Sequence, residues 1–168
     1  MRRIEDCIAR IGAVDARVME ESQRLQDMLT KPNGSLGKLE SLSVRLAGIY
    51  GSPRPQMGKK VVFTMAADHG VTQEGVSAYP SEVTRQMVLN FARGGAAINV
   101  LARHAGADVR VVDMGVDCDD DWPQCVIRRK LARGTKSMCR GPAMTGEEAR
   151  RCIETGIALA EDAVRDGY

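Results

Sequence analysis

Two apolar, β-branched runs predict strands that are buried on both faces. Residues 61–67 read VVFTMAA and residues 109–115 read VRVVDMG. Two helical stretches lie between them, at 80–92 and 94–106, and the second ends in a glycine. Strand, helices and strand make a βαβ unit, so we expect two parallel strands joined by a right-handed crossover.

Residues 1–50 follow a helical pattern instead. Apolar side chains recur every three or four positions over residues 3–29, which predicts one or two amphipathic helices with a break near Gly12. Pro32 and Gly34 end this stretch, and Ser35 is placed to cap the next helix. That helix is expected to bury a stripe formed by Leu39, Leu42, Leu46 and Ile49.

The last third of the chain begins with an irregular segment and ends in a helix. Residues 117–144 show no regular pattern apart from a short strand at 126–127. Thr145 and Glu148 then have the spacing of a capping box. An apolar stripe at helical spacing follows, at Ala149, Cys152, Ile153, Gly156, Ile157, Ala160 and Val164.

These elements predict an α/β fold with a Rossmann-like parallel sheet and flanking helices. A third strand is due after the last helix, so we expect the sheet to be incomplete in this chain and open at its edges. A Pro- and Gly-rich linker at 51–58 separates two parts. The expected domains are an N-terminal helical segment at 1–50 and the N-terminal part of a truncated α/β domain at 59–168.

Composition narrows the class of protein. The 168 residues are 43% hydrophobic and 27% charged, as in globular proteins, and the net charge of +2 comes without a strong basic tract. We therefore expect no nucleic-acid partner. Five cysteines without a CxxC pair argue against a zinc site or a disulfide framework and favour a cytoplasmic protein. Neither a signal peptide nor a membrane-spanning run of about 20 apolar residues is recognisable.

A polar loop after the first strand carries the candidate chemistry. Residues 66–80 read AADHGVTQEGVSAYP, and ligands of open α/β sheets bind at the carboxyl ends of strands. His69 could act as an acid or base that Asp68 orients. Alternatively, both side chains hold the loop backbone in shape.

Two further features allow two interpretations each. The Gly94–Gly95 pair opens a helix and could receive an anion, or it could serve close helix packing. Met87, on the helix after the loop, could give a ligand soft apolar contact or belong to the core.

Three long stretches resemble the nicotinate-nucleotide:dimethylbenzimidazole phosphoribosyltransferase family. They are LTKPNGSLGKLESLSVRLAGIYG, AADHGVTQEGVSAYPSEVTRQMVLNFARGGAAINVLAR and GADVRVVDMGVD, in the family's order and spacing. The resemblance implies transfer of ribose 5-phosphate from nicotinate mononucleotide to 5,6-dimethylbenzimidazole, which gives α-ribazole 5′-phosphate and nicotinate in cobalamin lower-ligand synthesis. It implies no metal or organic cofactor, a benzimidazole-type base as substrate, and a homodimer.

The resemblance also assigns residues. The family's slot for the aromatic base maps onto Ser77, Ala78, Tyr79, Pro80, Val83, Gln86 and Met87. Asp68, His69 and Gly70 are then expected to shape the site, with Asp68 and His69 contacting the backbone of residues 70–77. The family's catalytic glutamate and its Gly-rich phosphate-binding segment match no residue of this chain and are expected beyond Tyr168. We therefore expect the 168 residues alone to be inactive; the alternative is a non-catalytic base-binding module or a subunit that needs a partner chain.

Overall fold

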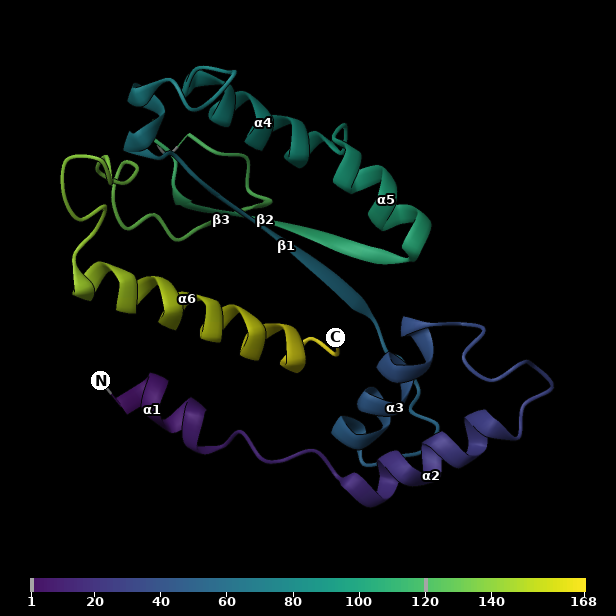
Figure 1. Ribbon diagram of the computed structural model, residues 1–168. Helices are drawn as coiled ribbons and strands as arrows, with labels where there is room; N and C mark the ends of the chain where they lie inside the picture. Colours follow the sequence, from purple (N-terminus) through teal and green to yellow (C-terminus); the bar gives the residue numbers. More distant parts are fainter. Residues whose placement is uncertain (1, 120) are drawn as a thin grey trace. The chain divides into compact units, whose positions relative to one another are not determined.

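The computed structural model describes residues 2–119 and 121–168, and the chain divides into two compact units, one before Gly58 and one from Gly58 onward. The larger unit contains a parallel three-stranded sheet in the order β1-β2-β3 (Figure 1). Its strands are β1 (Lys60–Ala67), β2 (Ala107–Gly115) and β3 (Val126–Arg128). The parallel pairing of β1 with β2 confirms the predicted βαβ unit, and β3 confirms the short strand expected at 126–127.

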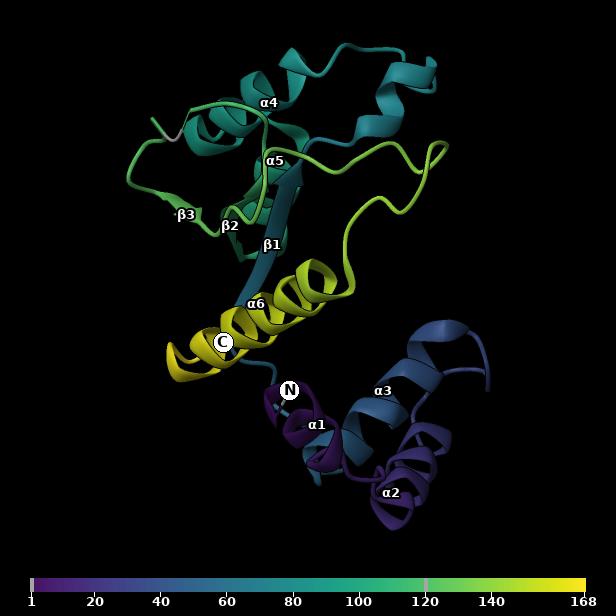
Figure 2. The same ribbon diagram turned by 90° about the vertical axis from the view of Figure 1, so that its left-hand side faces the viewer.

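Helices cover both faces of this sheet, as Figures 1 and 2 show. On one face lie α4 (Glu82–Arg93) and α5 (Ala97–Ala105), and on the other lies α6 (Gly146–Arg165). The capping box of α6 is confirmed: Thr145 Oγ1 accepts from the Glu148 amide at 3.1 Å, and Glu148 Oε2 accepts from the Thr145 amide at 2.7 Å. The short η1 helix (Gly70–Glu74) begins two residues after β1, beyond Asp68 and His69.

The core of the larger unit includes a residue from the segment that lacked a sequence pattern. Trp122, only 3% exposed, packs with buried residues of the sheet and of α4, among them Val88 and Val111. Its indole Nε1 donates to Asp113 Oδ2 at 2.6 Å. The irregular segment is therefore anchored to β2 by a buried side chain.

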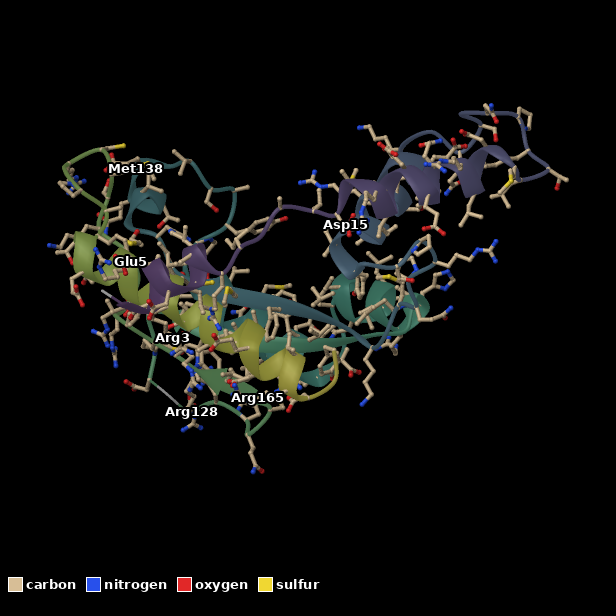
Figure 3. All side chains as sticks on the ribbon, turned by 90° about the horizontal axis from the view of Figure 1, so that it is seen from below. Arg3, Glu5, Asp15, Arg128, Met138 and Arg165 are labelled. Carbon is tan, nitrogen blue, oxygen red and sulfur yellow. The ribbon has the colours of Figure 1, made fainter. Side chains whose placement is uncertain are left out.

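The smaller unit contains three helices: α1 (Arg2–Ala9), α2 (Ala16–Asp27) and α3 (Lys38–Tyr50). Residues 10–15 separate the first two, which agrees with the predicted break near Gly12. Asp15 caps α2 (Figure 3), since its Oδ1 accepts from the amides of Arg17 and Val18 at 2.9 and 3.2 Å.

Two expectations for α3 were wrong. Ser35 does not cap it: the helix begins after Gly37, and Glu40 reaches back to accept from the amides of Gly34 and Leu36. The buried face is also a different one, because α2 packs against small residues that permit close approach. A Cβ added at Gly48 would lie 2.5 Å from the Met19 side chain. The buried residues of α3 are Val44, Ala47 and Gly48, whereas Leu39, Leu42 and Ile49 of the predicted stripe are exposed.

No helix of the described residues is long and apolar enough to cross a membrane.

Candidate functional site

The carboxyl ends of β1 and β2 carry one buried acid each. Asp113, fully buried, accepts hydrogen bonds from the amides of Gly115 and Val116 and from Trp122, and Lys130 Nζ lies 3.4 Å away. Asp68 is also buried, and its Oδ2 accepts from the Asp117 amide at 2.7 Å. Both carboxylates are thus engaged in holding the segment that follows β2.

The expectation that Asp68 contacts the backbone of residues 70–77 was wrong for its side chain. Because β1 and β2 are parallel neighbours, the loop that leaves β2 passes directly beside Asp68, and its carboxylate bonds there. The His69 backbone does reach the expected segment, since its carbonyl accepts from the Thr72 amide at 3.0 Å. The His69 side chain is exposed.

A cleft of about 600 Å³ opens between the end of β1 and the start of α4, and we call it the α4 cleft. It gathers most of the residues that the resemblance assigns to the base: Ser77, Tyr79, Pro80, Val83 and Met87, together with Asp68 and His69. Ala78 and Gln86 are exposed and lie outside its lining, and Gly70 lines a neighbouring cleft.

The walls of the α4 cleft suit a flat apolar molecule. Tyr79 is 71% exposed and Met87 37% exposed, so both present apolar surface that the described chain leaves uncovered. Phe91 and Met114 also line the cleft and were missed from the sequence. Phe91 could have been found, because it continues the helical spacing of Val83 and Met87 at intervals of four. Met114 could have been found from its place near the end of the second predicted strand, because ligands of open α/β sheets bind at the carboxyl ends of strands.

A second cleft, of about 410 Å³, lies on the α6 side of the same strand ends, and we call it the α6 cleft. Ala67, His69 and Met114 line both clefts, so the two meet where β1 and β2 end. Most of the remaining wall comes from residues 131–136 and from Met144, Glu148 and Cys152. Sequence reasoning missed this wall, because residues 131–136 and Met144 belong to the segment without a pattern, while Glu148 and Cys152 were interpreted only as parts of the last helix.

Glu148 is the one acid of the described residues that lines the α6 cleft. Hydrogen bonds from the Thr145 backbone and hydroxyl hold the pKa of this carboxyl below its ordinary value. Glu148 is therefore an ionised helix cap and is poorly suited to take up a proton.

The glycine pair before α5 favours the packing interpretation. A Cβ added at Gly95 would lie 2.4 Å from Asn90 Oδ1, so a larger residue here would require the Asn90 side chain to move. Asn99 Oδ1 accepts from the Ala96 amide at 3.2 Å, which occupies the helix start that an anion would need.

Within residues 2–119 and 121–168, no group of three or more His, Cys, Asp or Glu side chains is placed to bind a metal ion.

Known proteins match this chain closely. A family profile described as phosphoribosyltransferase matches residues 11–168. The nicotinate-nucleotide–dimethylbenzimidazole phosphoribosyltransferases of Geobacter sp. (strain M21) and Geobacter sulfurreducens are 55% and 56% identical, over 99% of this chain and 48% and 47% of their own. The crystal structure of such an enzyme from Thermus thermophilus has a TM-score of 0.83 at 47% identity, over 90% of this chain and 46% of that one. The chain thus spans about half the length of the curated relatives it matches.

Proposed function

Because the chain belongs to the phosphoribosyltransferase family, whose profile covers residues 11–168, we propose that it takes part in making a base–ribose bond. In this reaction ribose 5-phosphate passes from nicotinate mononucleotide to 5,6-dimethylbenzimidazole, and the products are α-ribazole 5′-phosphate and nicotinate. The names of relatives more than 50% identical support this reaction. The observation that carries the proposal is the α4 cleft, where most of the residues assigned to the base gather around one apolar space.

The reaction makes two demands on the protein: it must position the incoming base, and it must provide an acceptor for a proton. The bond between the anomeric carbon of the sugar and the nicotinate nitrogen breaks, and a ring nitrogen of the incoming base forms the new bond. The proton on the other ring nitrogen of the base must leave to an acceptor. The nucleophile is neutral and flat, so holding it in line with the anomeric carbon supplies much of the rate.

We assign the positioning of the base to the α4 cleft. Tyr79 and Met87 would contact the ring of the base, one from the loop and one from α4, and Ser77 and Pro80 would shape the loop between them. Asp68, His69 and Gly70 shape the site without carrying the proton. Asp68 is already bonded to the Asp117 amide, which supports a structural role. We assign no catalytic residue in this chain, since none matches the family's glutamate.

Product analysis tests the proposal. A protein of the relatives' full length, given nicotinate mononucleotide and 5,6-dimethylbenzimidazole, should release nicotinate and α-ribazole 5′-phosphate, detectable by liquid chromatography and mass spectrometry. Residues 1–168 alone should form the product at least about 10²-fold more slowly, the usual cost of losing a general base. Binding of the base without turnover by the longer protein would favour the non-catalytic binding module instead.

We also propose a homodimer that works in the cytoplasm. The exposed side chains of Leu39, Leu42 and Ile49 on α3 support an apolar contact surface, and all five cysteines are free thiols. Sedimentation of the longer protein should show a dimer at micromolar concentration, and Leu42→Glu should shift it toward monomer. A compact monomer of the unaltered protein would contradict the dimer.

A further inference from the structure

Two loops that are far apart in the sequence lie side by side at the carboxyl ends of the strands (Figures 1 and 2). The first, residues 70–80, contains η1 and leads into α4; we name it the slot loop, since it carries Ser77, Tyr79 and Pro80. The second, residues 134–141, lies between β3 and α6 and includes Met138 (Figure 3); we name it the bracing loop.

The backbones of the two loops are in direct contact at the start of the slot loop. The Gly70 amide donates to the Thr135 carbonyl at 3.0 Å, and the Thr135 amide donates to the Asp68 carbonyl at 3.0 Å. A Cβ added at Gly70 would lie 2.6 Å from backbone atoms of Thr135, Lys136 and Ser137. The bracing loop therefore fixes the point where the slot loop begins.

A second contact lies four residues further on, at the end of η1. Glu74 Oε1 accepts from Ser137 Oγ at 3.0 Å, and Arg140 Nε lies 3.3 Å from the same oxygen. Ser137 is buried, whereas the Arg140 side chain is 70% exposed. The hydrogen bond from Ser137 is partly buried, whereas the ion pair with Arg140 is screened by solvent because that side chain is largely exposed, so Ser137 is the main partner.

Beyond Glu74 the slot loop is exposed and its hydrogen bonds are local. The chain turns at Gly75, whose φ is +72°, and residues 75–80 are exposed. Ser77 Oγ donates to the Tyr79 carbonyl at 2.8 Å and accepts from its amide at 3.2 Å. The position of Tyr79 is thus set by Glu74 before the turn and by α4 after it.

We propose that Glu74 is a positioning residue for the aromatic base, acting through Ser137 to hold the slot loop over the α4 cleft. The proposal rests on the proposed function and adds to it a residue that does not line the α4 cleft. Without the Glu74–Ser137 bond, only the exposed Arg140 side chain still links the end of η1 to the bracing loop. Tyr79 then spends less time against the base, while the sugar phosphate is held elsewhere.

The experiment compares four variants in a protein of the relatives' full length: Glu74→Ala, Ser137→Ala, the double variant, and Glu74→Gln. Glu147→Ala is the control, because Glu147 is an equally acidic but exposed residue on the first turn of α6. Two quantities are measured: KM for 5,6-dimethylbenzimidazole and for nicotinate mononucleotide, and the amide hydrogen exchange of residues 75–79.

We expect Glu74→Ala and Ser137→Ala each to raise KM for the base about tenfold, the usual effect of losing one hydrogen bond to a charged group, with little change in KM for the nucleotide. The double variant should be no worse than Glu74→Ala, because Glu74→Ala already removes the bond to Ser137. Glu74→Gln keeps an oxygen that accepts from Ser137 and should recover most of the loss. Exchange at residues 75–79 should become faster in the Ala variants and stay unchanged in the control.

Equal rises in both KM values, or unchanged exchange in Glu74→Ala, would overturn the positioning role. The exchange measurement separates this proposal from the proposed function. If the unaltered protein forms no product, the proposed function fails, and exchange alone then decides: faster exchange supports the anchoring by Glu74, and unchanged exchange overturns it.

Discussion

The indole nitrogen of Trp122 donates a 2.6 Å hydrogen bond to Oδ2 of Asp113, and both side chains are buried. The bond joins the irregular segment after β2 to the strand itself. Oδ1 of the same carboxylate accepts from two amides, so both of its oxygens are used. Asp113 is therefore an acid at a strand end whose function is structural.

Removing this carboxylate should destabilise the fold. Asp113→Ala leaves Trp122, Lys130 and two amides without their buried acceptor, and should lower the free energy of unfolding by about 3–5 kcal/mol. Asp113→Asn should restore little of the lost stability, because the side-chain NH2 group of asparagine would face an N–H donor that now bonds to the carboxylate. Urea unfolding measures both. Asp119→Ala, which removes an exposed acid, serves as control and should change stability by about 0.5 kcal/mol or less. A mild effect of Asp113→Ala would contradict the anchoring role.

The α4 cleft predicts a selective kinetic effect. Tyr79→Ala and Met87→Ala, in a protein of the relatives' full length, should each raise KM for the base roughly tenfold, because each removes an apolar contact with the ring. KM for nicotinate mononucleotide should change much less. Leu101→Ala, an exposed change on α5, should alter neither value. Equal changes for both substrates would place the base elsewhere.

Replacing His69 tests whether this residue supports the loop or carries a proton in the reaction. His69→Ala should lower activity by loosening the loop at the meeting point of the two clefts, and the pH–rate profile should keep both of its limbs. The measurement is kcat/KM across the pH range for the variant and the unaltered protein. Loss of one limb while the loop remains ordered in a crystal would identify His69 as the group that titrates.

Glu40 predicts how the smaller unit responds to acid. The hydrogen bond from Lys31 and those from the Leu36 and Gly34 amides hold the pKa of Glu40 below its ordinary value of 4.5. A carboxyl whose pKa is lowered by folding stabilises the folded state above its unfolded pKa. That contribution is lost as the pH falls from about 4.5 through the folded pKa.

Thermal unfolding at pH 7 and at pH 3.5 should therefore show a smaller acid-induced loss of stability in Glu40→Gln than in the unaltered chain. Glu21→Gln, at an exposed position on α2, is the matched control and should follow the unaltered chain. An acid response in Glu40→Gln as large as in the control would rule out the stabilising role of Glu40.

The resemblance to the family assigned most of the residues that line the α4 cleft, and these residues are near neighbours along the chain. Val83 and Met87 lie one turn apart on the same face of α4, and Tyr79 lies in the loop just before this helix. One stretch of the chain therefore supplies most of the α4 cleft. Most of the wall of the α6 cleft was missed because a long loop brings residues 131–136 there. The contact between Glu74 and Ser137 spans 63 positions and has no local signature.

The sequence by itself determined the elements whose signals are local. Continuous apolar runs specified β1 and β2, and a capping box with a helical stripe specified α6, because backbone geometry repeats at a fixed period along the chain. Only the tertiary structure decided what the irregular segment after β2 does, since Trp122 and the bracing loop owe their positions to partners on β2 and η1. It also decided which face of α3 is buried: both faces carry apolar residues, and close packing against Met19 selected the one with the smaller side chains.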